Sequence, residues 1–218
     1  MTRLVLVRHG ETIWHAENRF AGSSDIPLTA RGHEQAERLA RWAKGAELDA
    51  IWVSPQRRAR ETAAPAERAT GMTARVDARL REIHFGRGEG LTSTEIEGSF
   101  PQAYAAFQLD PVGHHMPEGE DPHHVARRGI ECFQEIARAY PDHRVLVVTH
   151  STLMRLAFCE LVGIPLSQYR SMFPFVVNGA LMELGLERSK VSLLQYNSPA
   201  ELVAEDRGKD AEAETAAK

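Results

Sequence analysis

Three short segments of this sequence place histidine or arginine directly after an apolar run. Arg8-His9 follows the apolar residues 4–7, and His150-Ser151 follows the apolar residues 145–148. A third segment, Ser-Pro-Gln-Arg-Arg at residues 54–58, follows a shorter run. A neutral imidazole attacks phosphorus well, and a guanidinium group matches phosphate oxygens in a bidentate fork. These residue types therefore indicate phosphoryl transfer through a phosphohistidine.

Such a reaction also needs a carboxylic acid that protonates the leaving alcohol and later activates water. Glu82 is the candidate acid, because it lies in a predicted loop, Leu-Arg-Glu-Ile-His-Phe-Gly at residues 80–86. The alternative is a surface ion pair of Glu82 with Arg79 or Arg81, which contributes little to stability.

The elements that position these residues follow from hydrophobic periodicity. Apolar runs predict buried strands at residues 3–8, 49–53 and 144–149. Helical spacing predicts a helix that opens at the cap Thr29, and one that starts at Ser54-Pro55 and extends to about Thr70. Further helices are predicted at 122–139 and 151–162, a hairpin at 175–186 and 191–196, and at most two short helices between 80 and 116.

This alternation predicts an α/β fold, a three-layer sandwich whose mostly parallel central sheet is flanked by helices and ends in an antiparallel edge strand. Ligands of such sheets bind at the carboxyl ends of the strands, so the three segments are expected to form one site. Residues 1–198 are predicted to be one domain. Residues 199–218 lack core residues, and we expect them to be a disordered tail.

Composition excludes several classes of protein. The net charge of −4 argues against nonspecific binding of nucleic acid, and no apolar run is long enough to span a membrane. The two cysteines, Cys132 and Cys159, have apolar neighbours and are expected to be buried thiols in a reducing compartment. With no predicted signal peptide before Leu4, a cytoplasmic location is the expectation.

Several ordered motifs resemble those of the histidine phosphatase superfamily, which contains cofactor-dependent phosphoglycerate mutases and many small phosphatases. The N-terminal motif is Arg-His-Gly-Glu-Thr-Ile-Trp at residues 8–14, and the second is Ser-Pro-Gln-Arg-Arg-Ala-Arg-Glu-Thr-Ala at residues 54–63. Leu-Arg-Glu at 80–82 with Gly-Leu-Thr at 90–92 resembles the acid motif, and Val-Val-Thr-His at 147–150 the second-histidine motif. Pro117-Glu118-Gly119-Glu120 with Arg128, and Asn178, are also in register. The resemblance covers residues 4–196.

The resemblance implies a role for each matching residue. His9 would be the phosphorylated nucleophile and Glu82 the proton donor. Arg8, Arg58 and His150 would bind and polarise the phosphoryl group; Arg57 and Arg60 are the competing arginines near Arg58. The N–H of Ser151, at the start of a helix, would also bind the anion.

This chain departs from the family pattern at four positions. His15 replaces the usual Asn, and could donate to phosphate in one tautomer. Ala21 replaces a frequent Gln, Ser151 a Gly, and Gly88 a Trp. These changes are expected to affect substrate preference more than the core reaction.

The predicted function is therefore hydrolysis of small phosphomonoesters by a small phosphatase resembling the alpha-ribazole phosphatase branch, with no metal and no cofactor. A phosphoglycerate mutase is the alternative, disfavoured because residues 92–121 contain no Lys or Arg. A non-catalytic phosphate-binding module is a third. The loop histidines His114, His115, His123 and His124 are expected to be exposed rather than metal ligands. The sequence leaves the substrate open, and it is compatible with a monomer or a homodimer.

Overall fold

The structure, a computed structural model, describes residues 1–187 and 190–200 of the 218-residue chain. Its centre is a six-stranded sheet in the order β3-β2-β4-β1-β5-β6. The strands are β1 (Thr2–Arg8), β2 (Ala50–Val53), β3 (Arg75–Val76), β4 (Arg144–Thr149), β5 (Leu181–Glu187) and β6 (Lys190–Ser198). The first four run parallel, while β5 pairs antiparallel with both β1 and β6. The predicted mixed sheet is confirmed.

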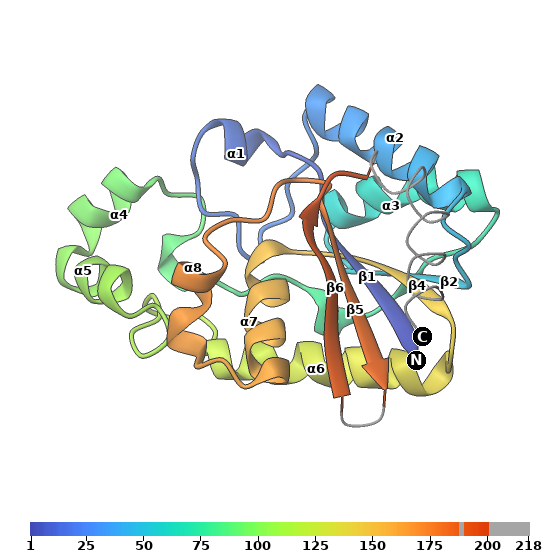
Figure 1. Cartoon of the computed structure of the whole chain (residues 1–218). Helices are drawn as coiled ribbons and strands as arrows, with labels where there is room; N and C mark the ends of the chain where they lie inside the picture. The colour runs from blue at the N-terminus through green and yellow to red at the C-terminus, as the bar shows by residue number, and fades with distance from the viewer. Residues whose placement is uncertain (188–189, 201–218) are drawn as a thin grey trace.

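Helices cover both faces of this sheet (Figure 1). One face packs on α2 (Ala30–Lys44) and α3 (Arg57–Thr70), and the other on α6 (Pro122–Ala139) and α7 (Ser151–Val162). Alternate residues of β1 divide between the two cores: Leu4 and Leu6 face α6 and α7, whereas Val5 and Val7 face α2 and α3. The three-layer sandwich is therefore confirmed.

The remaining helices are short. They are α1 (Ile13–Ala16), α4 (Ser93–Ser99), α5 (Pro101–Leu109) and α8 (Tyr169–Met172), with 3-10 turns at Ala78–Leu80, Gly86–Gly88 and Leu166–Gln168. In Figure 1, α4 and α5 lie beyond the end of the sheet, on the side away from the N-terminus. They pack on a small separate core of Ile96, Tyr104, Phe107 and Met116. The two short helices expected between residues 80 and 116 are thus present.

Some predicted boundaries are wrong for identifiable reasons. Pro55 lies outside α3, because Gln56 is the residue that caps the helix. The strand expected from Phe175 begins only at Leu181, because the carbonyls of Phe175 and Val176 accept side-chain donors, from Tyr196 and Arg8, in place of strand partners. The two-residue strand β3 was not predicted, being too short to show a period. The helix cap Thr29 is confirmed: its hydroxyl accepts the Gly32 N–H.

Two predictions fall partly or wholly on undescribed residues. The hairpin turn includes residues 188–189, and the C-terminal tail comprises residues 201–218, so both lie outside the described ranges. Among the helices of residues 1–187 and 190–200, none has the length and apolar character needed to cross a membrane.

Candidate active site

The three segments singled out by sequence meet at one edge of the sheet. Strands β2, β4 and β1 are parallel neighbours, so the residues after them, Ser54, His150 and His9, lie side by side. The imidazole centroids of His9 and His150 are 5.0 Å apart, and those of His9 and His15 are 5.4 Å apart.

The hydrogen bonds of His9 define its tautomer. The His9 side chain is buried, and its Nδ1 lies 2.7 Å from the carbonyl oxygen of Gly10. A carbonyl only accepts, so Nδ1 carries the proton and Nε2 keeps its lone pair. Burial, followed by the charge of Arg58, holds the pKa of His9 well below its usual value. His9 is therefore a neutral imidazole with Nε2 available as a nucleophile.

Arg58 is the arginine that faces His9. Its Nε lies 3.2 Å from His9 Nε2, while Nη1 and Nη2 donate to the carbonyls of Ser24 and Gly22, each at 2.7 Å. The Arg58 side chain is fully buried, which lowers its pKa. By contrast, the Arg57 side chain is 56% exposed and pairs with Glu61. The geometry thus agrees with the resemblance in singling out Arg58.

Arg8 and His15 hold each other. Arg8 Nη2 lies 2.6 Å from His15 Nε2, and Arg8 Nη1 donates to the carbonyl of Val176. Because arginine only donates, His15 Nε2 is the acceptor of this contact, while His15 Nδ1 lies 2.7 Å from the Thr12 hydroxyl and 3.2 Å from the Thr12 backbone nitrogen. Burial and then the charge of Arg8 lower the pKa of His15 to about 3.

The sequence predicts that His15 could donate a hydrogen bond to phosphate. In the structure its Nε2 contacts Arg8 instead. Arg8 keeps another donor for a ligand: its Nε is buried and has no hydrogen-bond partner among the described residues. Burial lowers the pKa of Arg8 to about 10, so it stays charged at neutral pH.

His150, like Arg8, has a buried nitrogen that is available to a ligand. Its Nε2 lies 2.7 Å from Ser54 Oγ, which itself accepts the Gln56 N–H at 3.3 Å. The Ser54 hydroxyl can then donate to Nε2, which leaves the imidazole proton on Nδ1. This Nδ1 is buried and has no partner in the described part of the chain. Burial, then the charge of Arg58, keeps the pKa of His150 well below its usual value.

Glu82 lies at the N-terminus of α7, buried rather than at the surface. Its Oε2 accepts the N–H of Thr152 at 3.0 Å, and its Oε1 accepts the N–H of Leu153 at 3.1 Å. Arg79 and Arg81, the alternative partners considered for Glu82, pair with other carboxylates. Ser151 opens the same helical turn, where backbone N–H groups point out of the helix end.

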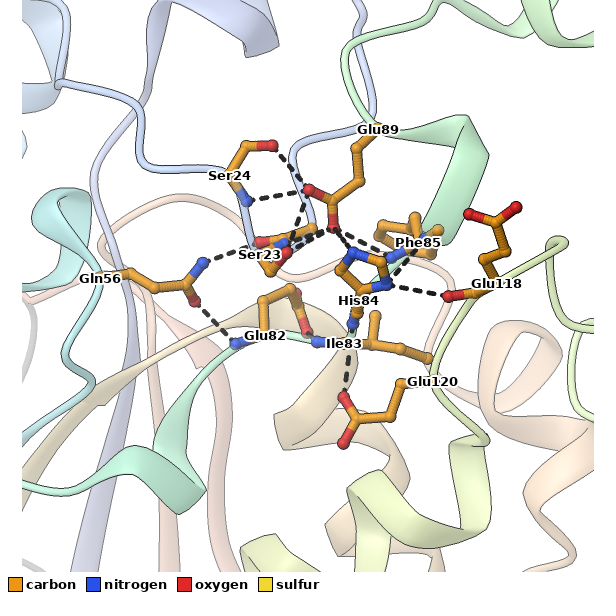
Figure 2. Close-up of polar contacts among 12 residues, drawn as sticks. Ser23, Ser24, Gln56, Glu82, Ile83, His84, Phe85, Glu89, Glu118 and Glu120 are labelled. Carbon is orange, nitrogen blue, oxygen red and sulfur yellow. Dashed lines mark hydrogen bonds and ion pairs between the residues drawn. The ribbon is translucent and has the colours of Figure 1, made fainter.

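Two buried side chains that the sequence did not predict as site residues position Glu82 and His150. Gln56 accepts the Glu82 N–H through its Oε1 at 2.8 Å (Figure 2). It donates through Nε2 to the Gly22 carbonyl, also at 2.8 Å. The sequence places Ser54 only as the residue that follows a strand, and in the structure its hydroxyl orients His150. A polar residue between a strand and a helix is the only signal for either, and it does not specify their partners.

Arg128 stabilises the segment that leads to Glu82. Its guanidinium pairs with Glu120 at 2.9 Å and donates to the carbonyls of Arg79, Arg81 and Glu82. Arg128 and Glu120 were expected to be in register with the family, and the structure shows that they brace residues 79–82.

The loop histidines and the aromatic residues have other surroundings. His114, His115, His123 and His124 are exposed, and across the described ranges no three His, Cys, Asp or Glu side chains are grouped to hold a metal ion. Met116 and Phe107 are buried in the small core beside α4 and α5.

The chain belongs to the histidine phosphatase superfamily (branch 1), whose sequence profile matches residues 4–199. Phosphoserine phosphatase 1 of Hydrogenobacter thermophilus is 30% identical over 78% of this chain and 81% of its own length. A probable phosphoglycerate mutase of Escherichia coli is 34% identical over 76% of this chain and 77% of its own.

Solved structures are similar as well. That of mycobacterial glucosyl-3-phosphoglycerate phosphatase with VO3 superposes with a TM-score of 0.82 at 30% identity, over 90% of this chain and 98% of that one.

Proposed function

We propose that this protein hydrolyses small phosphomonoesters through a phosphohistidine formed on His9. The observation that carries this proposal is the tautomer of His9, whose unprotonated Nε2 accepts a hydrogen bond from Arg58 Nε. Membership of a family with phosphatase members, including the two phosphatases above, supports the same reaction class.

The reaction would proceed in two steps. His9 Nε2 forms a bond to phosphorus as the bond from phosphorus to the ester oxygen breaks, and Glu82 gives the departing alkoxide a proton. Glu82 then takes a proton from water as the water oxygen attacks phosphorus and the N–P bond breaks. The products are an alcohol, inorganic phosphate and the original enzyme.

The other predicted site residues would bind the phosphoryl oxygens. Arg8 Nε and His150 Nδ1 are buried donors without a partner in the described structure, and unsatisfied buried donors are costly. A phosphate oxygen would satisfy each of them. Arg58 and the N–H of Ser151 would supply further donors, and His15 would act by orienting Arg8.

Phosphoglycerate mutase activity is the second candidate, because a relative carries that name. A mutase must retain its phosphate donor and bind a diacid, and we infer that this requires cations above the site. Residues 92–121, which include α4 and α5, contain no Lys or Arg. The phosphatase is therefore the better-supported function.

The expected surroundings of the protein are also part of this proposal. Cys132 and Cys159 are buried free thiols, consistent with a reducing, cytoplasmic compartment. A small phosphorylated metabolite would be its partner, and size measurement in solution would decide between a monomer and a homodimer.

The test is phosphate release from a panel of phosphomonoesters, including p-nitrophenyl phosphate and phosphoserine, by the wild type and by His9→Ala. We expect hydrolysis by the wild type and background rates for the variant. Equal rates in both proteins would exclude His9 as the nucleophile. Conversion of 3-phosphoglycerate to 2-phosphoglycerate faster than phosphate release would favour the mutase.

A further inference from the structure

Glu89 lies between the acid loop and a turn of the N-terminal segment. Its carboxylate accepts the backbone N–H groups of Ser23 and Ser24, at 2.6 and 3.0 Å, and also both serine hydroxyls (Figure 2). It accepts the N–H of Phe85 at 3.1 Å as well. Among the described residues its contact with a basic side chain within 4.0 Å is with His84 Nε2 at 3.8 Å, and that imidazole is 45% exposed. The Glu89 carboxylate thus accepts hydrogen bonds mainly from uncharged donors of the turn at Ser23 and Ser24.

That turn is the one that holds Arg58. The carbonyls of Gly22 and Ser24, on either side of Ser23, accept the two terminal nitrogens of the guanidinium. Gly22 also accepts Gln56 Nε2, which connects the turn to the N–H of Glu82. Glu89 is therefore separated from the phosphate-facing arginine by a single turn of backbone.

The contact is too close to tolerate a side chain in between. Gly22 has a φ of +47°, and a Cβ there would lie 2.0 Å from Glu89 Oε1. Both the left-handed conformation and the space left for the carboxylate require glycine at this position. The turn and Glu89 are therefore built to fit each other.

We propose that Glu89 is a positioning residue for Arg58. By binding four donors of Ser23 and Ser24 it aims the carbonyls of residues 22 and 24 at the guanidinium. This fixes the remaining guanidinium donors toward the phosphoryl group. Because Glu89 follows Glu82 in the same loop, it also ties the proposed acid to the phosphate-binding arginine. This inference rests on the proposed function, in that Arg58 must bind phosphate.

The informative variant is Glu89→Gln. The amide keeps one oxygen for Ser23 and Phe85, but places an NH2 group against the N–H and hydroxyl of Ser24. We expect kcat/KM and the affinity for vanadate to fall together by roughly tenfold or more, as expected when hydrogen bonds to a charged group are lost. Glu95→Gln is the matched control, because Glu95 also accepts a backbone N–H but is itself exposed and pairs with Arg19. We expect less than about a twofold effect from it.

A double-mutant cycle distinguishes positioning from general destabilisation. In an Arg58→Lys background, Glu89→Gln should change vanadate affinity by less than about twofold, because its route of action is gone. An equal loss in both backgrounds, or no loss in the wild type, would overturn the inference. If Glu89→Gln lowers Tm enough to prevent assay, Ser24→Ala removes one of the same contacts and should show the same non-additivity.

Failure of the inference is distinguishable from failure of the proposed function. A wild-type protein that neither hydrolyses phosphomonoesters nor binds vanadate contradicts the function itself. An active, vanadate-sensitive wild type whose Glu89→Gln variant behaves identically contradicts only the role of Glu89.

Discussion

At the scale of single residues, the site concentrates positive charge around neutral imidazoles. Arg8 and Arg58 are both buried, and burial together with these charges keeps His9 and His150 unprotonated. A protonated His9 would have no lone pair for phosphorus, so in the proposed reaction the arginines would bind the substrate and also keep the nucleophile neutral. The dianionic phosphoryl group is then the natural complement of the site.

The assignment of Glu82 as proton donor leads to a prediction about leaving groups. Glu82→Gln cannot donate a proton as an acid, so it should slow hydrolysis of alkyl phosphates by about 10²-fold or more. p-Nitrophenolate departs without protonation, so kcat/KM for p-nitrophenyl phosphate, which reports phosphorylation of His9 and not the later attack of water, should fall far less. Steady-state kinetics on both substrates makes the comparison. An equal loss on both would indicate that Glu82 acts only as the cap of α7.

At the scale of elements, the loop after β1 is packed against the first turn of α2 through two glycines. A Cβ on Gly10 would lie 2.6 Å from the Gly32 carbonyl oxygen, and one on Gly32 would lie 2.1 Å from that of Glu11. The N–H of Gly10 also donates to Thr62 on α3 at 2.9 Å. These backbone contacts set the position of His9 relative to α2 and α3.

Gly32→Ala should therefore be strongly destabilising, by about 2 kcal/mol or more, because backbone would have to move. The control is Gly45→Ala at the other end of the same helix, where nothing lies within 4 Å of the added Cβ. There we expect a change within about 0.5 kcal/mol. Urea denaturation measures both variants. Similar stability for the two would show that the loop does not depend on this close approach.

Elements were predictable where their signal was local. The periodic apolar residues of α6 and the apolar run of β4 predict the bounds of both elements to the residue. The meeting of the polar residues at one edge followed from the prediction of a parallel sheet. Contacts between distant segments were not predictable. The cap that Glu82 provides for α7 joins residues about 70 positions apart, and Glu89 reaches Ser23 across 66. No local pattern specifies such partners, and for His15 only the fold reveals that Arg8 occupies its Nε2.

At the scale of the whole molecule, the buried histidines couple stability to pH. In the unfolded chain each histidine binds a proton below about pH 6.5, whereas the depressed pKa values prevent this in the folded protein. The unfolded state thus binds more protons as pH falls. The contribution of these histidines to the free energy of unfolding should accordingly be complete above about pH 6.5 and decline below it.

His15 provides the measurable case, because its folded pKa is about 3. Between about pH 4 and 6, the His15→Asn variant should lose one proton's share of the slope, about 1.4 kcal/mol per pH unit. Urea denaturation of both proteins across this range, in phosphate-free buffer, gives the two slopes. Parallel curves would mean that His15 is protonated in the folded state.

The central claim, that His9 carries the phosphoryl group, is tested most directly by trapping the intermediate. Enzyme mixed with phosphorus-32-labelled substrate and quenched within milliseconds in alkaline denaturant should retain label. Peptide mapping should place it on His9, with release in acid and stability in base. Labelled, alkali-stable phosphate on His9 at a level that accounts for turnover is the result we predict. Rapid turnover with no label on His9 at any quench time would contradict the account.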